Sequence, residues 1–218
     1  MYSDSEGIVL RQTKTVNGRR MIVLFSKQYG KISAGTSISE RGKNKTALAL
    51  RPFTYGRYEL FRGRDTYSIN GAETIQGFYQ FGENIDKFMC ASYVLELSDH
   101  LLPDEQPSPQ LFALLLDFFT LLEKRSSAFE TLVIGFQMKA LVIEGVAPDL
   151  SQAPSEGPLA RLTAEDLDAL RYIAAHPLSS LEKIALKADG EKRLRAALKS
   201  YYSYHLGIEN LKSESLII

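Results

Sequence analysis

A stretch of basic and aromatic residues stands out in the first third of the chain. Residues 41–64 contain seven Lys and Arg but a single acid, Glu59, and they include four aromatic side chains. Lysine and arginine contact phosphates without reading the base sequence, and aromatic faces stack on unpaired bases. These residue types therefore predict a surface that binds single-stranded nucleic acid by charge and stacking.

The charges divide between two parts of the chain. Residues 1–71 carry 13 Lys and Arg against 5 Asp and Glu, and residues 72–218 carry 13 against 21, so a net charge of zero hides +8 and −8. Such a division predicts a polyanionic partner for the first part. The candidate nucleic-acid contacts are Arg11, Lys14, Arg19, Arg20, Lys31, Arg41, Lys43, Lys45, Arg51, Arg57, Arg62 and Arg64, with Tyr55 as a stacking candidate.

Residues that could perform catalysis are present but not assembled into a motif. The three histidines stand apart, no nucleotide-binding or nucleophile motif occurs, and solvation or capping explains loop carboxylates such as Asp104 and Glu105. The single cysteine, Cys90, excludes a disulfide framework and suits a reducing cytoplasm. We expect no enzymatic activity, no cofactor, no metal site and no membrane segment. An enzyme with an unrecognised site is the weakest alternative.

The first 80 residues have the pattern of a small β-barrel. Five short strands are predicted at 7–14, 19–27, 31–38, 54–62 and 65–75, separated by turn sequences and one polar loop. An oligonucleotide-binding (OB) barrel is the commonest five-stranded choice, with an SH3-like barrel as the alternative. Alternation along 54–62 places Tyr58 in the core, and leaves Tyr55 and Phe61 open between core and surface.

The remainder, residues 81–218, is predicted to be an all-helical domain. Helices are expected at 83–102, 108–124, 129–146, 163–176 and 191–207, with a loop or hinge at 147–162. Thr163 and Asp166 have the spacing of a capping box. The first helix is expected to bury an apolar stripe that includes Cys90 and, broadly aligned with it, Ile85, Phe88, Met89, Ser92, Leu95 and Leu102. The last is expected to expose a basic face formed by Lys192, Arg195, Lys199 and Tyr202.

Four ordered stretches of the sequence resemble the RecO family of bacterial recombination mediators. They are EGIVLRQTK (6–14), YGKISA (29–34) with RPF (51–53), YVLELSDHLLP (93–103) with PSPQLFALLL (107–116), and YYSYHLG (201–207) with LKS (211–213). The resemblance implies an α+β protein with an N-terminal OB barrel and a helical C-terminal domain. It implies binding of single- and double-stranded DNA, strand annealing, and partnership with RecR and with the single-stranded-DNA-binding protein (SSB), so that RecA loads in the cytoplasm at the nucleoid.

Two further expectations depend on this resemblance. Many relatives carry a four-cysteine zinc element after the third helix, which this chain lacks, so residues 147–162 should form a metal-free connection. The acidic, apolar tail of SSB needs a hydrophobic socket flanked by cations, for which Lys124, Arg125, Phe129 and Lys139 are the candidates. The rival function is a protein-interaction adaptor whose basic barrel binds an acidic protein.

Overall fold

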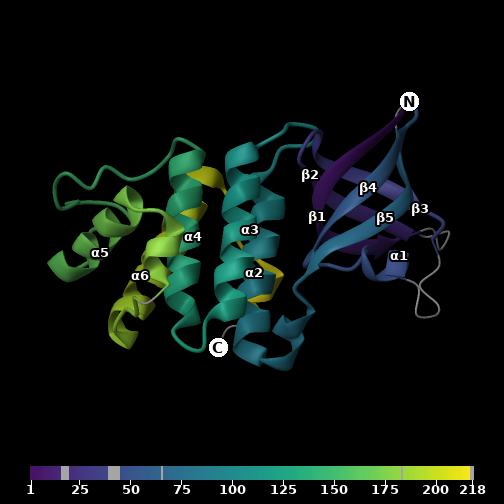
Figure 1. Ribbon diagram of the computed structural model, residues 1–218. Helices are drawn as coiled ribbons and strands as arrows, with labels where there is room; N and C mark the ends of the chain where they lie inside the picture. Colours follow the sequence, from purple (N-terminus) through teal and green to yellow (C-terminus); the bar gives the residue numbers. More distant parts are fainter. Residues whose placement is uncertain (16–19, 39–44, 65, 183, 217–218) are drawn as a thin grey trace. The chain divides into compact units, whose positions relative to one another are not determined.

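The structure is a computed structural model that describes residues 1–15, 20–38, 45–64, 66–182 and 184–216. These residues form two compact units. The barrel unit comprises Met1–Gly82 and Leu95–Phe112, and the helical unit comprises Glu83–Val94 and Ala113–Ile218. Each unit is described by itself below, with its elements labelled in Figure 1.

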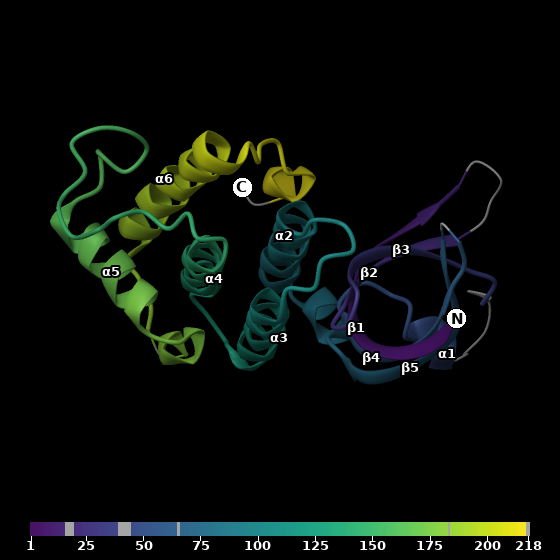
Figure 2. The same ribbon diagram turned by 90° about the horizontal axis from the view of Figure 1, so that it is seen from above.

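The barrel unit is built on five strands that close into a ring (Figure 2). The strands are β1 (Tyr2–Lys14), β2 (Arg20–Ser26), β3 (Gly30–Thr36), β4 (Thr54–Arg62) and β5 (Tyr67–Gly77), joined in the order β1-β2-β3-β5-β4. Among the strands of the described residues, β3 and β5 pair in parallel and the other neighbours pair antiparallel. This topology confirms the predicted OB barrel rather than the SH3-like alternative. Strand β1 begins five residues earlier than predicted.

The barrel core follows from the alternation of side chains along the strands. On β4, Thr54, Gly56, Tyr58 and Leu60 are buried while their neighbours reach the outer surface. Tyr58 is fully buried, as expected, and its hydroxyl donates a 2.8 Å hydrogen bond to the carbonyl of Ala49. A short helix that the sequence did not reveal, α1 (Lys45–Leu48), precedes β4.

Two long helices contribute residues to both units. They are α2 (Ile85–Leu101) and α3 (Pro109–Lys124), and residues 102–108 form the α2–α3 connection, which belongs to the barrel unit. The other helices are α4 (Phe129–Ile143), α5 (Ala164–Ala175) and α6 (Ala188–Leu206), with 3₁₀ turns at Tyr79–Glu83, Leu178–Leu181 and Lys212–Leu216. The segment between α4 and α5 contains no helix or strand, as predicted. No helix in the described ranges is long and apolar enough to cross a membrane.

Two predicted helix faces are only partly correct. On α2, Cys90 and Leu95 are buried as expected, but Ile85 and Phe88 are 68% and 38% exposed, and Val94 and Leu97 are buried in addition. On α6, Tyr202 is buried and its hydroxyl donates to the carbonyl of Gln137 at 2.8 Å.

Two of the remaining cations on the α6 face form ion pairs. Arg195 forms a 2.8 Å ion pair with Glu130, and Lys199 pairs with Glu214. The face therefore has no continuous row of exposed cations.

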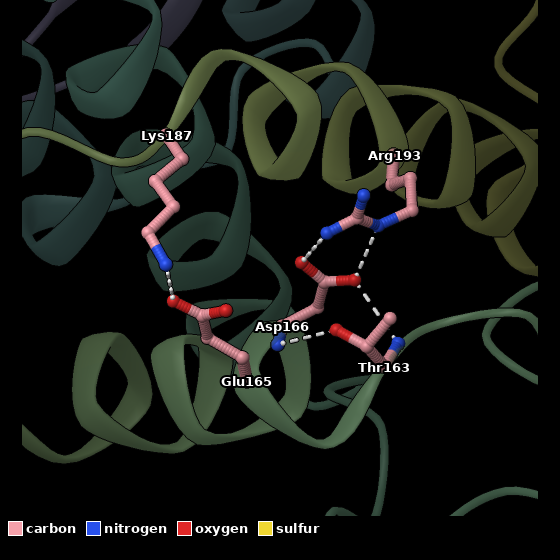
Figure 3. Close-up of polar contacts among 5 residues, drawn as sticks. All are labelled: Thr163, Glu165, Asp166, Lys187 and Arg193. Atoms are coloured by element: carbon pink, nitrogen blue, oxygen red, sulfur yellow. Dashed lines mark hydrogen bonds and ion pairs between the residues drawn. The ribbon is translucent and has the colours of Figure 1, made fainter.

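A polar joint connects α5 with α6 (Figure 3). The predicted capping box is present: the Thr163 hydroxyl accepts from the amide of Asp166, and the Asp166 carboxylate accepts from the amide of Thr163. The same carboxylate, which is 3% exposed, accepts two hydrogen bonds from Arg193 at 2.7 and 2.9 Å. The Arg193 guanidinium, together with the Thr163 amide, holds the pKa of Asp166 at about 2, below its ordinary value of 3.8.

We expect Asp166→Asn to destabilise the helical unit by about 1–2 kcal/mol at pH 7, a value reduced because Arg193 is partly solvated. The carboxylate has a lowered pKa in the folded state. Its contribution is therefore full above pH 3.8 and is lost as the pH falls towards 2. Urea unfolding followed by far-UV circular dichroism between pH 7 and pH 3 should show the difference from wild type shrinking with acidity.

The matched control is Asp168→Asn on the same helix. Asp168 pairs with Arg171 on the surface, where its side chain is 72% exposed, and such pairs contribute little. Equal losses in the two variants would contradict a specific role for the joint.

Candidate nucleic-acid interface

A groove of about 300 Å³ lies against β2 and β3 of the barrel unit. Met21, Ser33 and Gly35 contribute to its strand side, and Thr66 and Tyr67 contribute from the β4–β5 turn. In OB folds the face of strands 2 and 3, together with the β1–β2 and β4–β5 loops, binds oligonucleotides. The groove therefore lies where the fold places a nucleic-acid strand.

The α2–α3 connection places acids at this groove. The carboxylate of Glu105 accepts from Arg62 Nη2 at 3.1 Å, and the Asp104 carboxylate lies 3.5 Å from Lys31 Nζ. The guanidinium of Arg62 also lies 5.3 Å from the ring centre of Tyr67. Solvation and capping were the only roles expected for Asp104 and Glu105, so this placement is a correction. The local sequence could not predict the ion pair, because Arg62 and Glu105 are 43 residues apart.

Tyr67 remains a hydrogen-bond donor at the groove. Burial, reinforced by the nearby Glu105 carboxylate, raises the pKa of its hydroxyl. The hydroxyl lies 3.4 Å from that carboxylate and donates to it. Because it is neutral, this donor suits any oxyanion in the same position.

Two predicted contacts, Arg11 and Lys31, meet at one carboxylate. Arg11 Nε donates to Asp99 at 2.7 Å, while Lys31 Nζ donates to the Asp99 carbonyl at 2.8 Å and lies 3.5 Å from its carboxylate. Asp99 belongs to the last turns of α2. These cations therefore tie β1 and β3 to that end of α2, and Lys31 is only 18% exposed. The contacts thus join residues from three of the stretches that resemble the RecO family.

Arg20 is not a surface cation, contrary to the prediction. It is 7% exposed, and its guanidinium donates to the carbonyl of Ile38 at 2.9 Å and to the side chain of Gln12 at 3.1 Å. The guanidinium is therefore buried and held by these polar contacts instead of facing solvent.

The outer face of β1, β4 and β5 is acidic around Arg57. Arg57 stands opposite Glu6 on β1 and Glu73 on β5. Tyr55 is half-buried: its ring lies edge-on to Phe112 at 6.1 Å, and its hydroxyl donates to Glu6 at 2.8 Å. Burial and the Glu6 hydrogen bond raise the pKa of Tyr55 to about 12. Tyr55 is therefore not an open ring for stacking, and the positive charge of Arg57 is balanced by two acids.

The remaining predicted cations are exposed. Lys14 ends β1, Lys45 begins α1, Arg51 precedes β4 and Arg64 lies in the β4–β5 turn. Within the described ranges, Lys45, Arg51 and Arg64 take part in no ion pair. Arg19, Arg41 and Lys43 lie outside the described residues, so the structure does not place them.

The charge of the barrel unit is smaller than the sequence division suggested. The α2–α3 connection and the end of α2 bring four acids and no Lys or Arg, so the unit holds 13 Lys and Arg against 10 Asp and Glu. The net charge is +3 rather than +8. For DNA binding, exposed cations without an acidic neighbour are therefore more important than the net charge of the unit.

The four predicted partner-tail residues do not form one socket. Lys124 is exposed, whereas Arg125 is 9% exposed and donates to the carbonyls of Ser127, Leu181, Glu182 and Ile184. Arg125 is therefore buried, whereas it was expected to lie at the surface and bind a partner. Lys139 donates to the carbonyl of Ala174 at 2.8 Å.

A residue that was not predicted accompanies Phe129. The ammonium of Lys87 lies 5.7 Å from the ring centre of Phe129 and donates to the carbonyl of Glu123 at 2.7 Å. Because 42 positions separate Lys87 and Phe129 in the sequence, no local pattern could have paired them. Phe129 and Lys87 thus lie together, and the exposed Lys124 directly follows Glu123, whose carbonyl Lys87 contacts. These three residues are the candidate partner surface that remains.

Within the described part of the chain, no three His, Cys, Asp or Glu side chains come close enough to hold a metal ion. Cys90 is buried, and this burial raises the pKa of its thiol well above the ordinary value. The sequence and geometry together define an OB-fold protein with a groove on β2 and β3 and an additional helical unit.

Comparison with known proteins gives the family. Residues 1–78 match the model "Recombination protein O N terminal", and residues 82–158 and 155–215 match "Recombination protein O C terminal". The chain is 27% identical to the DNA repair protein RecO of Alkaliphilus metalliredigens, over 98% of this chain and 97% of that protein. It is 29% identical to the DNA repair protein RecO of Myxococcus xanthus, over 96% and 94%. The chain belongs to the RecO family.

Proposed function

We propose that this RecO-family protein is a DNA-binding recombination mediator without enzymatic activity of its own. It binds single- and double-stranded DNA, promotes annealing by neutralising phosphate repulsion, and helps RecA load onto strands coated with SSB. The observation that carries the proposal is family membership over both halves of the chain, combined with an OB barrel that has a groove on β2 and β3 with Lys31 in its lining.

The DNA surface is expected to include the groove and the exposed cations of the barrel unit that form no ion pair among the residues that the structure describes. Changing Lys45, Arg51 and Arg64 together to Glu should weaken binding of labelled single-stranded DNA about 10–100-fold near 0.1 M salt. The slope of log K against log salt should fall by about 2, because roughly three phosphate contacts are lost. Fluorescence anisotropy measures both quantities.

Arg57→Glu serves as the matched control for Arg64→Glu. Both side chains are exposed arginines on or beside β4, but Arg57 stands between Glu6 and Glu73. We expect the Arg64 variant to lose more affinity than the Arg57 variant. Equal losses, or unchanged binding by the triple variant, would refute the proposed surface.

Annealing should proceed without nucleotide or metal. An absolute requirement for ATP hydrolysis by this chain would exclude the mediator mechanism and favour the enzyme alternative. The adaptor alternative predicts tight binding of an acidic protein with no measurable affinity for DNA.

RecR and SSB are the proposed protein partners. For the acidic, apolar SSB tail, the surface formed by Phe129, Lys87 and Lys124 supplies a ring and two ammonium groups. Arg125 is excluded from this surface because carbonyl oxygens surround its guanidinium.

A further inference from the structure

The carboxylate of Glu105 lies among donors that would also suit a phosphate group. Arg62 Nη2 donates to it at 3.1 Å and the hydroxyl of Tyr67 at 3.4 Å. Guanidinium groups bind phosphate and carboxylate oxygens with the same geometry, and a neutral hydroxyl donates to either. Both donors lie where β4 ends and β5 begins, and Tyr67 lines the groove together with Glu105.

The backbone that carries Glu105 is fixed to the barrel. Its amide donates to the carbonyl of Lys31 at 2.9 Å, and Lys31 and Asp104 form a parallel bridge. Strand β5 pairs with β3 only over Ala34 to Thr36, so the connection takes the part of the β3 edge that β5 leaves open. Glu105 also has φ 55°, a left-handed conformation that is uncommon for a residue with a side chain. Strained backbone of this kind is often found at binding sites.

The ion pair itself is weak enough to be exchanged. The side chains of Arg62 and Glu105 are 54% and 53% exposed. Ion pairs with this exposure contribute little to the stability of a protein. A phosphate entering the groove can therefore replace the carboxylate at small cost, while the backbone of the connection stays in place.

We propose that Arg62 and Tyr67 form a phosphate subsite for a single DNA strand, which the Glu105 carboxylate occupies in the DNA-free protein. Glu105 thereby weakens DNA binding by direct competition for Arg62. The inference deepens the proposed function and depends on it, because the phosphate belongs to the strand that the barrel binds.

The test is Glu105→Gln, which removes the charge and keeps the shape of the side chain. We expect it to tighten binding of a labelled oligo-dT about 3–10-fold at low salt. The salt slope should steepen by about 0.7, the value for one phosphate of a single strand, since no displaced carboxylate takes up a cation. Glu73→Gln is the control, because it removes the same charge from the outer face of β5.

A double-mutant cycle identifies the residue for which Glu105 competes. In an Arg62→Gln background, Glu105→Gln should give no further gain. If Glu105→Gln binds DNA no tighter than Glu73→Gln, or if the gain persists without Arg62, the subsite is overturned. A gain for a poly-glutamate peptide but not for oligo-dT would assign the site to an acidic protein and also overturn it. Failure of the wild type to bind DNA at all would instead remove the proposed function, and this inference with it.

Discussion

Arg125→Ala is expected to lower the free energy of unfolding of the helical unit by about 3–5 kcal/mol. Its Nε donates to the carbonyl of Ser127 at 2.7 Å, and its terminal nitrogens donate to the carbonyls of Leu181, Glu182 and Ile184. Arg125 is only 9% exposed, so truncation would leave buried carbonyl oxygens without hydrogen-bond donors. Urea unfolding followed by the helical signal at 222 nm measures the loss.

The adjacent residue supplies the control. Lys124 carries the same charge but is exposed, so Lys124→Ala should change the unfolding free energy by less than about 0.5 kcal/mol. Arg125→Lys should recover only part of the loss, because an ammonium cannot reach carbonyls spread around a planar guanidinium. Equal stability of the Arg125→Ala and Lys124→Ala variants would show that the carbonyl contacts contribute nothing.

The same variants separate folding from partner binding. An Arg125→Ala protein of normal stability that fails to bind an SSB-tail peptide would restore the surface role expected from the sequence. Loss of peptide binding by Lys124→Ala, with stability unchanged, would support the surface formed by Phe129, Lys87 and Lys124. The two roles thus predict opposite patterns of stability and affinity.

Local features of the fold could be predicted because they depend on residues close together in the sequence. Alternation along residues 54–62 placed Tyr58 in the core, and the spacing of Thr163 and Asp166 predicted a capping box that is present. Both patterns are set by the repeat of a strand or the first turn of a helix. The five strands and their turns indicated an OB barrel for the same reason.

The position and contacts of each Lys and Arg side chain could not be predicted in this way. Arg11 and Asp99 form an ion pair across 88 positions, and Arg125 meets carbonyls more than 50 positions further along the chain. A charge count assigns every Lys and Arg to the surface, although Arg20 is buried and Arg57 lies between two acids. Tertiary contacts, which the local pattern does not contain, decide which cations remain available for DNA.

Gly30→Ala is the second variant for which a large loss is expected, about 3 kcal/mol or more in the stability of the barrel unit. Gly30 has φ 71°, and a Cβ at this position would overlap the backbone carbonyl of Gln106 and lie 2.6 Å from its nitrogen. Neither group is the flexible end of a side chain. The α2–α3 connection would therefore have to move away from β3 and break the hydrogen bond from Glu105 to Lys31.

Gly145→Ala separates the two causes of this loss. Gly145 has a similar φ of 72° but no atom within 4 Å of the added carbon, so it reports the left-handed backbone alone, about 1 kcal/mol. Hydrogen exchange of the amides of β2, β3 and residues 102–108 should show increased opening in Gly30→Ala only. If the two variants lose equal stability, the connection does not need close contact at Gly30, and the fixed position assigned to Glu105 would lose its structural basis.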